Sequence, residues 1–315
     1  MKKLLLLSGL LLSVYSFAQE ASDTTAKEVK NWKSKAVFGL NGTQSSFVNW
    51  NAGGRNNISL LGFINGQANY SKNKFQWKNT LDFALGGLQY IGVGSSGEGL
   101  QKTDDRLEVS TEFGIKLREK LYASLLSSFK TQSLAGYKYP DDSTVLSRFM
   151  APGYVNVALG INFDPNEHFT VFISPANAKM TFVNDQTLAD AGAFGVKAAE
   201  YDLTTGELLK RGENFRFELG ALLNMKYNKD IFENINLVAS LNLFSNYLNH
   251  PENIDVNTDL LFTFKVNSWF SASFNMSLIY DNDIKITDRN GNTGPRTQYK
   301  SVLGAGVSYT VKNTK

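Results

Sequence analysis

The sequence predicts an all-β fold: an antiparallel, up-and-down transmembrane β-barrel of about twelve strands. Three observations support this prediction. Apolar residues recur at every second position over long segments, charged residues stay off the apolar side of those segments, and short and long connections alternate along the chain. Together they indicate strands that cross a bilayer and return through hairpins.

The clearest predicted hairpin covers Glu213 to Tyr247. Its first half, ENFRFELGALLNMKY, alternates apolar residues such as Phe217 with polar residues such as Arg216 and Glu218. The second half repeats the pattern after a short polar turn predicted around Asn228 to Asp230. Each arm has about thirteen residues, so at about 3.3 Å per residue and a tilt near 40° it rises roughly 30 Å, the thickness of a bilayer core.

The N-terminal residues 1–18 are predicted to be a signal peptide. Lys2 and Lys3 precede an apolar run that ends at Val14, and the small residue Ala18 stands before the expected cleavage site. We therefore expect the chain to be exported.

Residues 19–34 are predicted to form a short polar lead, and residues 35–315 a single outer-membrane barrel. The predicted strands are Lys35 to Phe47, Asn57 to Tyr70, Phe75 to Tyr90, Arg106 to Leu117, Leu121 to Gln132, Tyr154 to Phe163, His168 to Val183, Asn214 to Tyr227, Asn234 to Tyr247, Ile254 to Asn267, Trp269 to Tyr280 and Tyr299 to Val311. A soluble β-sandwich also alternates apolar and polar residues, but its strands are typically about half this length. Short periplasmic turns, long extracellular loops and an even strand number favour the membrane barrel.

Charged residues on the polar side of these strands are the candidate lumen residues. A charge on the lipid side would cost roughly 2 to 4 kcal/mol, which explains the segregation. The candidate lumen charges are Lys78, Asp82, Glu108, Glu112, Lys116, Arg216, Glu218, Lys226, Asp259 and Lys265. Bulky residues such as Phe172 and Phe244 share this side, so the sequence allows either a narrow pore or a plugged interior.

Two loop motifs are candidate contact sites. In QSSFVNWNAGG, Gly53 and Gly54 fit a tight outer turn and Trp50 an interfacial anchor, whereas Gln44, Asn49 and Trp50 could also form a tip that contacts a ligand or a partner.

The second motif is AGAFGV, in the long connection Asn184 to Glu213. It contains Phe194 and Gly195 and is apolar for an exposed loop. We hypothesise that it folds into the barrel mouth as a constriction.

Composition excludes several classes of function. The chain has no cysteine, so disulfides and thiolate metal sites are excluded. Its formal net charge of +3 includes Lys2 and Lys3 of the predicted signal peptide, so the remainder is nearly neutral and no nucleic-acid surface is predicted. A mean hydropathy of -0.23 excludes a helical membrane protein.

The sequence predicts no catalytic residue, cofactor or metal. The two histidines, His168 and His250, are predicted at opposite ends of the barrel, so no base lies beside a nucleophile. In the acidic loop that begins at Asp281, the pattern counted from Asp288 has Thr293 in place of the glycine and Tyr299 in place of the glutamate of a calcium loop. This favours solvated acids but leaves calcium binding open.

Several motifs together resemble an uncharacterised family of Bacteroidota proteins known as domain of unknown function 3078. They are QSSFVNWNAGG at 44–54, GLQKTDD at 99–105, ADAGAFGV at 189–196, LFSNYL at 243–248, NIDVN at 253–257 and LIYDNDIKI at 278–286. The resemblance implies an outer-membrane β-barrel and brings no assigned reaction or substrate.

These observations predict a non-enzymatic outer-membrane barrel in contact with outer-membrane lipid, acting as a narrow porin-like channel for small solutes or as a structural barrel subunit. The alternative is a scaffold with a closed lumen that docks other outer-membrane or envelope proteins. A more remote alternative is a lipid-active barrel enzyme.

Overall fold

The computed structural model describes residues 31–46, 55–91, 99–287 and 291–313. These residues fall within one compact unit, Asn31–Thr314. The predicted signal peptide 1–18, most of the polar lead 19–34, and loop residues 47–54, which include Asn49, Trp50, Gly53 and Gly54, lie outside the described residues.

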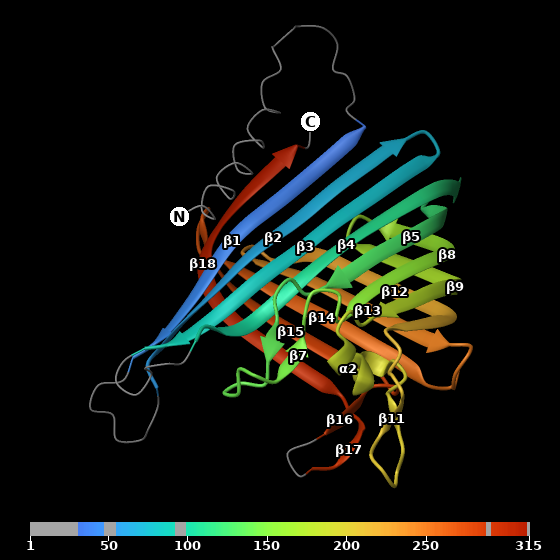
Figure 1. Ribbon diagram of the computed structural model, residues 1–315. Coiled ribbons are helices and arrows are strands. Elements are labelled where there is room, and N and C mark those ends of the chain that lie inside the picture. The colour runs from blue at the N-terminus through green and yellow to red at the C-terminus, as the bar shows by residue number, and fades with distance from the viewer. Residues whose placement is uncertain (1–30, 47–54, 92–98, 288–290, 314–315) are drawn as a thin grey trace, which may run out of the picture. The chain divides into compact units, whose positions relative to one another are not determined.

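Twelve strands of the described residues close into an antiparallel barrel, which confirms the predicted fold class (Figure 1). They are β1 (Trp32–Ser45), β2 (Asn57–Lys72), β3 (Phe75–Tyr90), β4 (Gln101–Arg118), β5 (Leu121–Thr131), β8 (Gly153–Asn166), β9 (Phe169–Phe182), β12 (Phe215–Phe232), β13 (Ile235–Asn246), β14 (Ile254–Lys265), β15 (Phe270–Tyr280) and β18 (Gln298–Asn313). Each strand pairs with its neighbours along the chain, and β1 pairs with β18 to close the barrel.

The connections alternate between two rims, as predicted. We call the rim with the connections 73–74, 119–120, 167–168, 233–234 and 266–269 the short-turn rim, and the opposite one the long-loop rim. The long connections contain β6 (Gly136–Tyr137), β7 (Val145–Ser147), α2 (Gln186–Asp190), the 3-10 turn η2 (Ala193–Gly195), β10 (Glu200–Tyr201), β11 (Leu208–Lys210), β16 (Lys285–Thr287) and β17 (Thr293–Pro295). In Figure 1, β7, α2, β11, β16 and β17 gather at one end of the barrel.

Several strand ends differ from the prediction, and three of them are informative. β1 begins at Trp32, so the last residues of the predicted polar lead belong to the barrel. β4 begins at Gln101 instead of Arg106, because the chain continues to pair with β3 beyond a bulge. β12 continues to Phe232, so the turn predicted around Asn228 to Asp230 is wrong. The polar side chains of residues 228–230 do not end the backbone hydrogen bonding between β12 and β13.

The apolar stripes of the strands face outward. Leu159 is 62% exposed and Ile173 is 56% exposed, although both lie in the middle of long strands. In a soluble sandwich such stripes would pack against each other in a core. Here they form an exposed apolar surface far larger than water-soluble proteins usually carry.

The described residues contain no helix that is long and apolar enough to cross a membrane.

Candidate functional site in the barrel interior

Strand alternation places all ten candidate lumen charges on the interior face. The side chains on this face are shown to point inward by contacts between strands that are not neighbours. Lys78 on β3 donates to Asp164 on β8 at 2.7 Å, and Asn41 on β1 donates to Ser273 on β15 at 3.1 Å. Such contacts form only across the inside of a closed barrel. The ten residues are Lys78, Asp82, Glu108, Glu112, Lys116, Arg216, Glu218, Lys226, Asp259 and Lys265.

An ion-pair network centred on Lys179 lies near the long-loop rim. The Lys179 ammonium is 3.0 Å from the Asp255 carboxylate, 3.5 Å from Glu218 and 3.8 Å from Asp281. These partners come from β14, β12 and the connection after β15, so one cation ties several strands together. The Glu218 side chain is only 1% exposed, so it depends on this cation and on Arg216 to offset its desolvation.

Sequence analysis missed Lys179 as an interior residue. Its position has the same parity as the outward residue Ile173, which predicts that both face the same side. The structure shows a bulge in β9 near Pro175, where the pairing with β8 and β12 shifts. One extra residue reverses the alternation beyond it, so Lys179 points inward. Pro175 was the signal in the sequence, because proline inside a strand marks bulges.

Arg216 connects the barrel wall to two long loops. Its guanidinium forms ion pairs with Glu218 at 2.9 Å and with Asp283, and it donates to the Gly195 carbonyl oxygen at 3.2 Å. Gly195 has a φ of 80° and lies so close that an added Cβ would stand 2.2 Å from the Arg216 side chain. The AGAFGV motif therefore reaches an interior residue of the wall.

The connections 132–152 and 183–214 pack together, and we call them the loop cap. Their shared core consists of Ala151, Val183, Leu188, Ala189 and Val196, and Phe194 packs against it. An ion pair of 3.2 Å between Arg148 and Asp185 also joins the two connections. Within this cap Asp190 accepts from Gln186 and from the Gly212 amide, and these hydrogen bonds lower the pKa of its carboxyl.

The substitution Gly212→Ala is expected to loosen the loop cap. The new Cβ would meet the Ala189 carbonyl oxygen at 2.2 Å, and because the other nearby atoms also belong to the backbone there is little room to adjust. Overpacking of this kind costs about 1 to 3 kcal/mol. Limited trypsin digestion should cut after Lys197 faster than in the unsubstituted protein. The control is Gly294→Ala, where an added Cβ meets nothing within 4 Å; equal cleavage rates in both variants would contradict the prediction.

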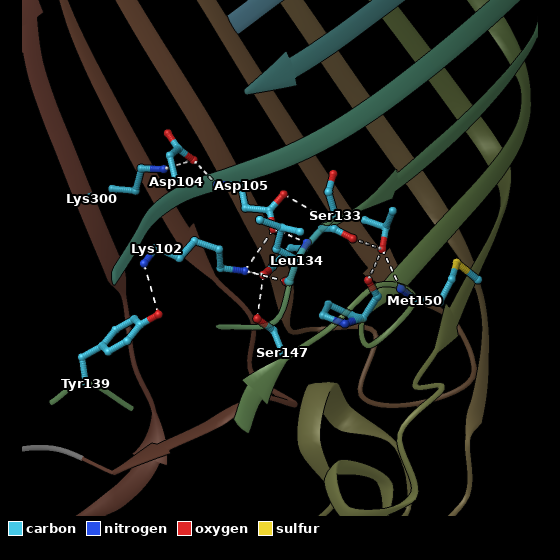
Figure 2. Close-up of polar contacts among 12 residues, drawn as sticks. Lys102, Asp104, Asp105, Ser133, Leu134, Tyr139, Ser147, Met150 and Lys300 are labelled. Carbon is cyan, nitrogen blue, oxygen red and sulfur yellow. Dashed lines mark hydrogen bonds and ion pairs between the residues drawn. The ribbon is translucent and has the colours of Figure 1, made fainter. Parts of the chain in front are cut away.

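Figure 2 shows how connection 132–152 is held to β4. The Lys102 ammonium lies 3.1 Å from Asp105 and donates to the Leu134 carbonyl oxygen at 2.9 Å. Asp105, whose side chain is almost fully buried, accepts from the amides of Ser133 and Leu134. The same view shows the pair between Asp104 on β4 and Lys300 on β18, at 2.9 Å, which links strands that are not neighbours.

A cavity of about 170 Å³ lies in the interior beneath the cap. Arg106 and Lys130 line it from one wall, and Asp259, Ser277 and Lys300 line it from strands on the other side of the barrel. The lining therefore offers both signs of charge together with hydroxyl groups.

The two histidines lie at opposite rims. His168 follows a short turn, with Nδ1 3.1 Å from the Asn228 carbonyl oxygen, and His250 lies in a long loop 3.1 Å from Glu252. Neither has a serine within hydrogen-bonding distance in the described residues.

Two acids of the loop considered for calcium form ion pairs. Asp281 lies near Lys179, and Asp283 pairs with Arg216. Among the described residues no cluster of His, Asp and Glu is arranged to hold a metal ion. Asp288 lies outside the described residues. Gln44, the one described residue of the QSSFVNWNAGG candidate set, is exposed near the end of β1, where it pairs with Ile58.

The fold and the interior together define a class of protein: a closed β-barrel with an exposed apolar exterior and an ion-paired interior. Residues 43–137, less than half of the chain, match the family described as protein of unknown function (DUF3078). A search of curated proteins finds no match.

Comparison with solved structures gives matches that cover most of this chain at low sequence identity. The translocator domain of autotransporter NalP from Neisseria meningitidis has 11% sequence identity and a TM-score of 0.35, with 96% of this chain and 94% of that chain covered. An outer membrane channel from Pseudomonas putida F1 has 12% identity and a TM-score of 0.38, with 93% and 100% covered. Because these TM-scores are low, the assignment of the barrel rests on the strand pairing of this chain itself.

Proposed function

We propose that this chain is a non-enzymatic outer-membrane barrel, exported by residues 1–18, that forms a narrow channel for small polar solutes. The observation that carries the proposal is the contrast between the two faces of the same strands. The outward side chains are apolar and exposed, whereas the inward ones are charged and surround a cavity. Contact with lipid explains the apolar outward face, and contact with water explains the charged inward face.

The dimensions favour small solutes. Twelve strands about 4.8 Å apart and tilted by about 40° enclose a backbone diameter of roughly 24 Å, and side chains leave at most about 10 Å clear. Interior ion pairs and the loop cap narrow this further at the long-loop rim. A channel of this size would pass small solutes and exclude folded proteins.

Deletion of residues 190–197 tests the channel proposal. The deletion removes η2 and the Gly195 contact with Arg216, so single-channel conductance in planar bilayers should rise about twofold or more, because the narrowest part of a pore limits its current. The control is deletion of residues 203–206, the exposed tip between β10 and β11, which should leave the conductance unchanged.

A second candidate function is a scaffold with a closed lumen. Ion pairs across the interior, such as Asp104 with Lys300 and Lys78 with Asp164, join strands that are not neighbours and favour a plugged barrel. A scaffold would show no discrete conductance either with or without residues 190–197. It would also retain a partner protein during purification in mild detergent.

A further inference from the structure

The basic side chains of the interior fall into two groups that differ in pairing. Six described ones near the long-loop rim have carboxylate partners: Lys102 with Asp105, Arg106 with Asp82, Lys130 with Glu108, Lys179 with Glu218, Arg216 with Glu218 and Asp283, and Lys300 with Asp104. These charges are locally neutralised, so they do little to attract an anion from solution.

Most interior lysines near the short-turn rim lack such a partner. The exception is Lys78, which pairs with Asp164 at 2.7 Å. Six further lysines near this rim are directed to the interior face by strand alternation, and all six are exposed. None forms an ion pair with a described residue. We call this group the lysine ring; it consists of Lys33, Lys35, Lys116, Lys226, Lys265 and Lys312.

The ring surrounds the mouth instead of clustering on one wall. Its members come from β1, β4, β12, β14 and β18, five of the twelve strands. Asp230 is an acidic group that attracts Lys35, and its carboxylate already accepts a hydrogen bond from the Asn236 side chain. The short-turn mouth therefore carries a surplus of positive charge.

Two members of the ring repel each other directly. Lys35 and Lys312 are cross-strand partners in the β1–β18 pair, and Lys265 is a further positive charge that acts on Lys35. Like charges in directly opposed positions destabilise a sheet. Lysine on both strands of the β1–β18 pair therefore lowers the stability of the barrel at this place. Residue choices that lower stability without a structural benefit concentrate at functional sites.

We infer that the lysine ring is a binding site for a soluble multivalent anion of the phosphate class at the short-turn mouth. Each lysine ammonium offers up to three N–H donors on a flexible stem, which can converge on phosphate oxygens from several strands. Walls of low dielectric focus the potential of the ring into the mouth. A multivalent anion can engage several lysines at once, which chloride cannot do. Because the lysines point inward, a solute in the mouth reaches them more readily than a lipid headgroup outside the wall.

Titration calorimetry with inorganic pyrophosphate tests this inference on the purified full chain in a mild neutral detergent. The double substitution Lys35→Gln with Lys312→Gln should weaken pyrophosphate binding about tenfold, since each lost contact removes a charge-assisted hydrogen bond. The matched control is Lys72→Gln with Lys74→Gln, two exposed lysines at the short-turn rim: Lys72 lies on the outward face of β2, and Lys74 lies in the turn that follows. It removes the same charge and should leave the affinity unchanged.

Three results would overturn the inference. The unsubstituted chain could show no saturable binding, or both double variants could lose affinity equally, which would indicate diffuse attraction. Binding could also vanish in nanodiscs of phosphatidylglycerol but persist in phosphatidylcholine, which would assign the ring to lipid phosphate. The variant with Lys35→Gln and Lys312→Gln is expected to fold, because it removes the repulsion between two like charges. The measurement does not require an open pore, so it stands apart from the conductance experiment.

Discussion

The substitution Lys179→Met is expected to lower the free energy of unfolding of the barrel by about 3 to 5 kcal/mol. It would leave Glu218, Asp255 and Asp281 close together without the cation that holds them. Glu218 is too buried to recover its solvation from water. Urea unfolding of the barrel refolded in detergent micelles, followed by tryptophan fluorescence, measures the loss.

The matched control is Lys130→Met. Lys130 also pairs with an interior glutamate, Glu108, but the distance is 3.9 Å and both side chains are more than one third exposed. Such a pair contributes at most about 1 kcal/mol. If both substitutions cost the same, the buried network is not the origin of the stability. The double substitution Lys179→Met with Glu218→Gln should cost less than the sum of the two single ones, because the residues are coupled.

A charge on the exterior tests the membrane assignment. The substitution Leu159→Lys should cost about 2 to 4 kcal/mol in vesicles, because Leu159 lies outward in the middle of β8. In the control Leu203→Lys, the residue is a fully exposed loop residue with 103% relative exposure, and the cost should be close to zero. Equal small costs at the two positions would show that the outward stripe does not face lipid.

Much of the fold followed from the sequence because the signal is local. In β12, Phe217 and Glu218 follow each other on opposite faces, and this period of two continues over a length that only a bilayer requires. The hairpins then follow from the order of the strands. The extension of β12 past Asp230 did not follow, because backbone pairing continues under polar side chains that resemble a turn.

The site was less predictable because it depends on contacts between distant strands. The sequence placed Arg216 and Glu218 in the interior, and the structure locates both there, but it gave no sign that Lys179 would bind Glu218. A bulge near Pro175 reverses which residues of β9 face inward, and strict alternation along the sequence does not predict this reversal. The contact of Gly195 with Arg216 likewise depends on how a long connection folds back.

The seam between β1 and β18 bears on how the barrel assembles. All the other ladders join strands that follow each other in the chain, whereas this one joins residues as distant as Ser34 and Asn313. Because these segments are so far apart in the chain, pairing them has the largest entropic cost of loop closure. We therefore expect β1 and β18 to pair last during folding. Until then both strands present unpaired edges, which are the surfaces most prone to association with other chains.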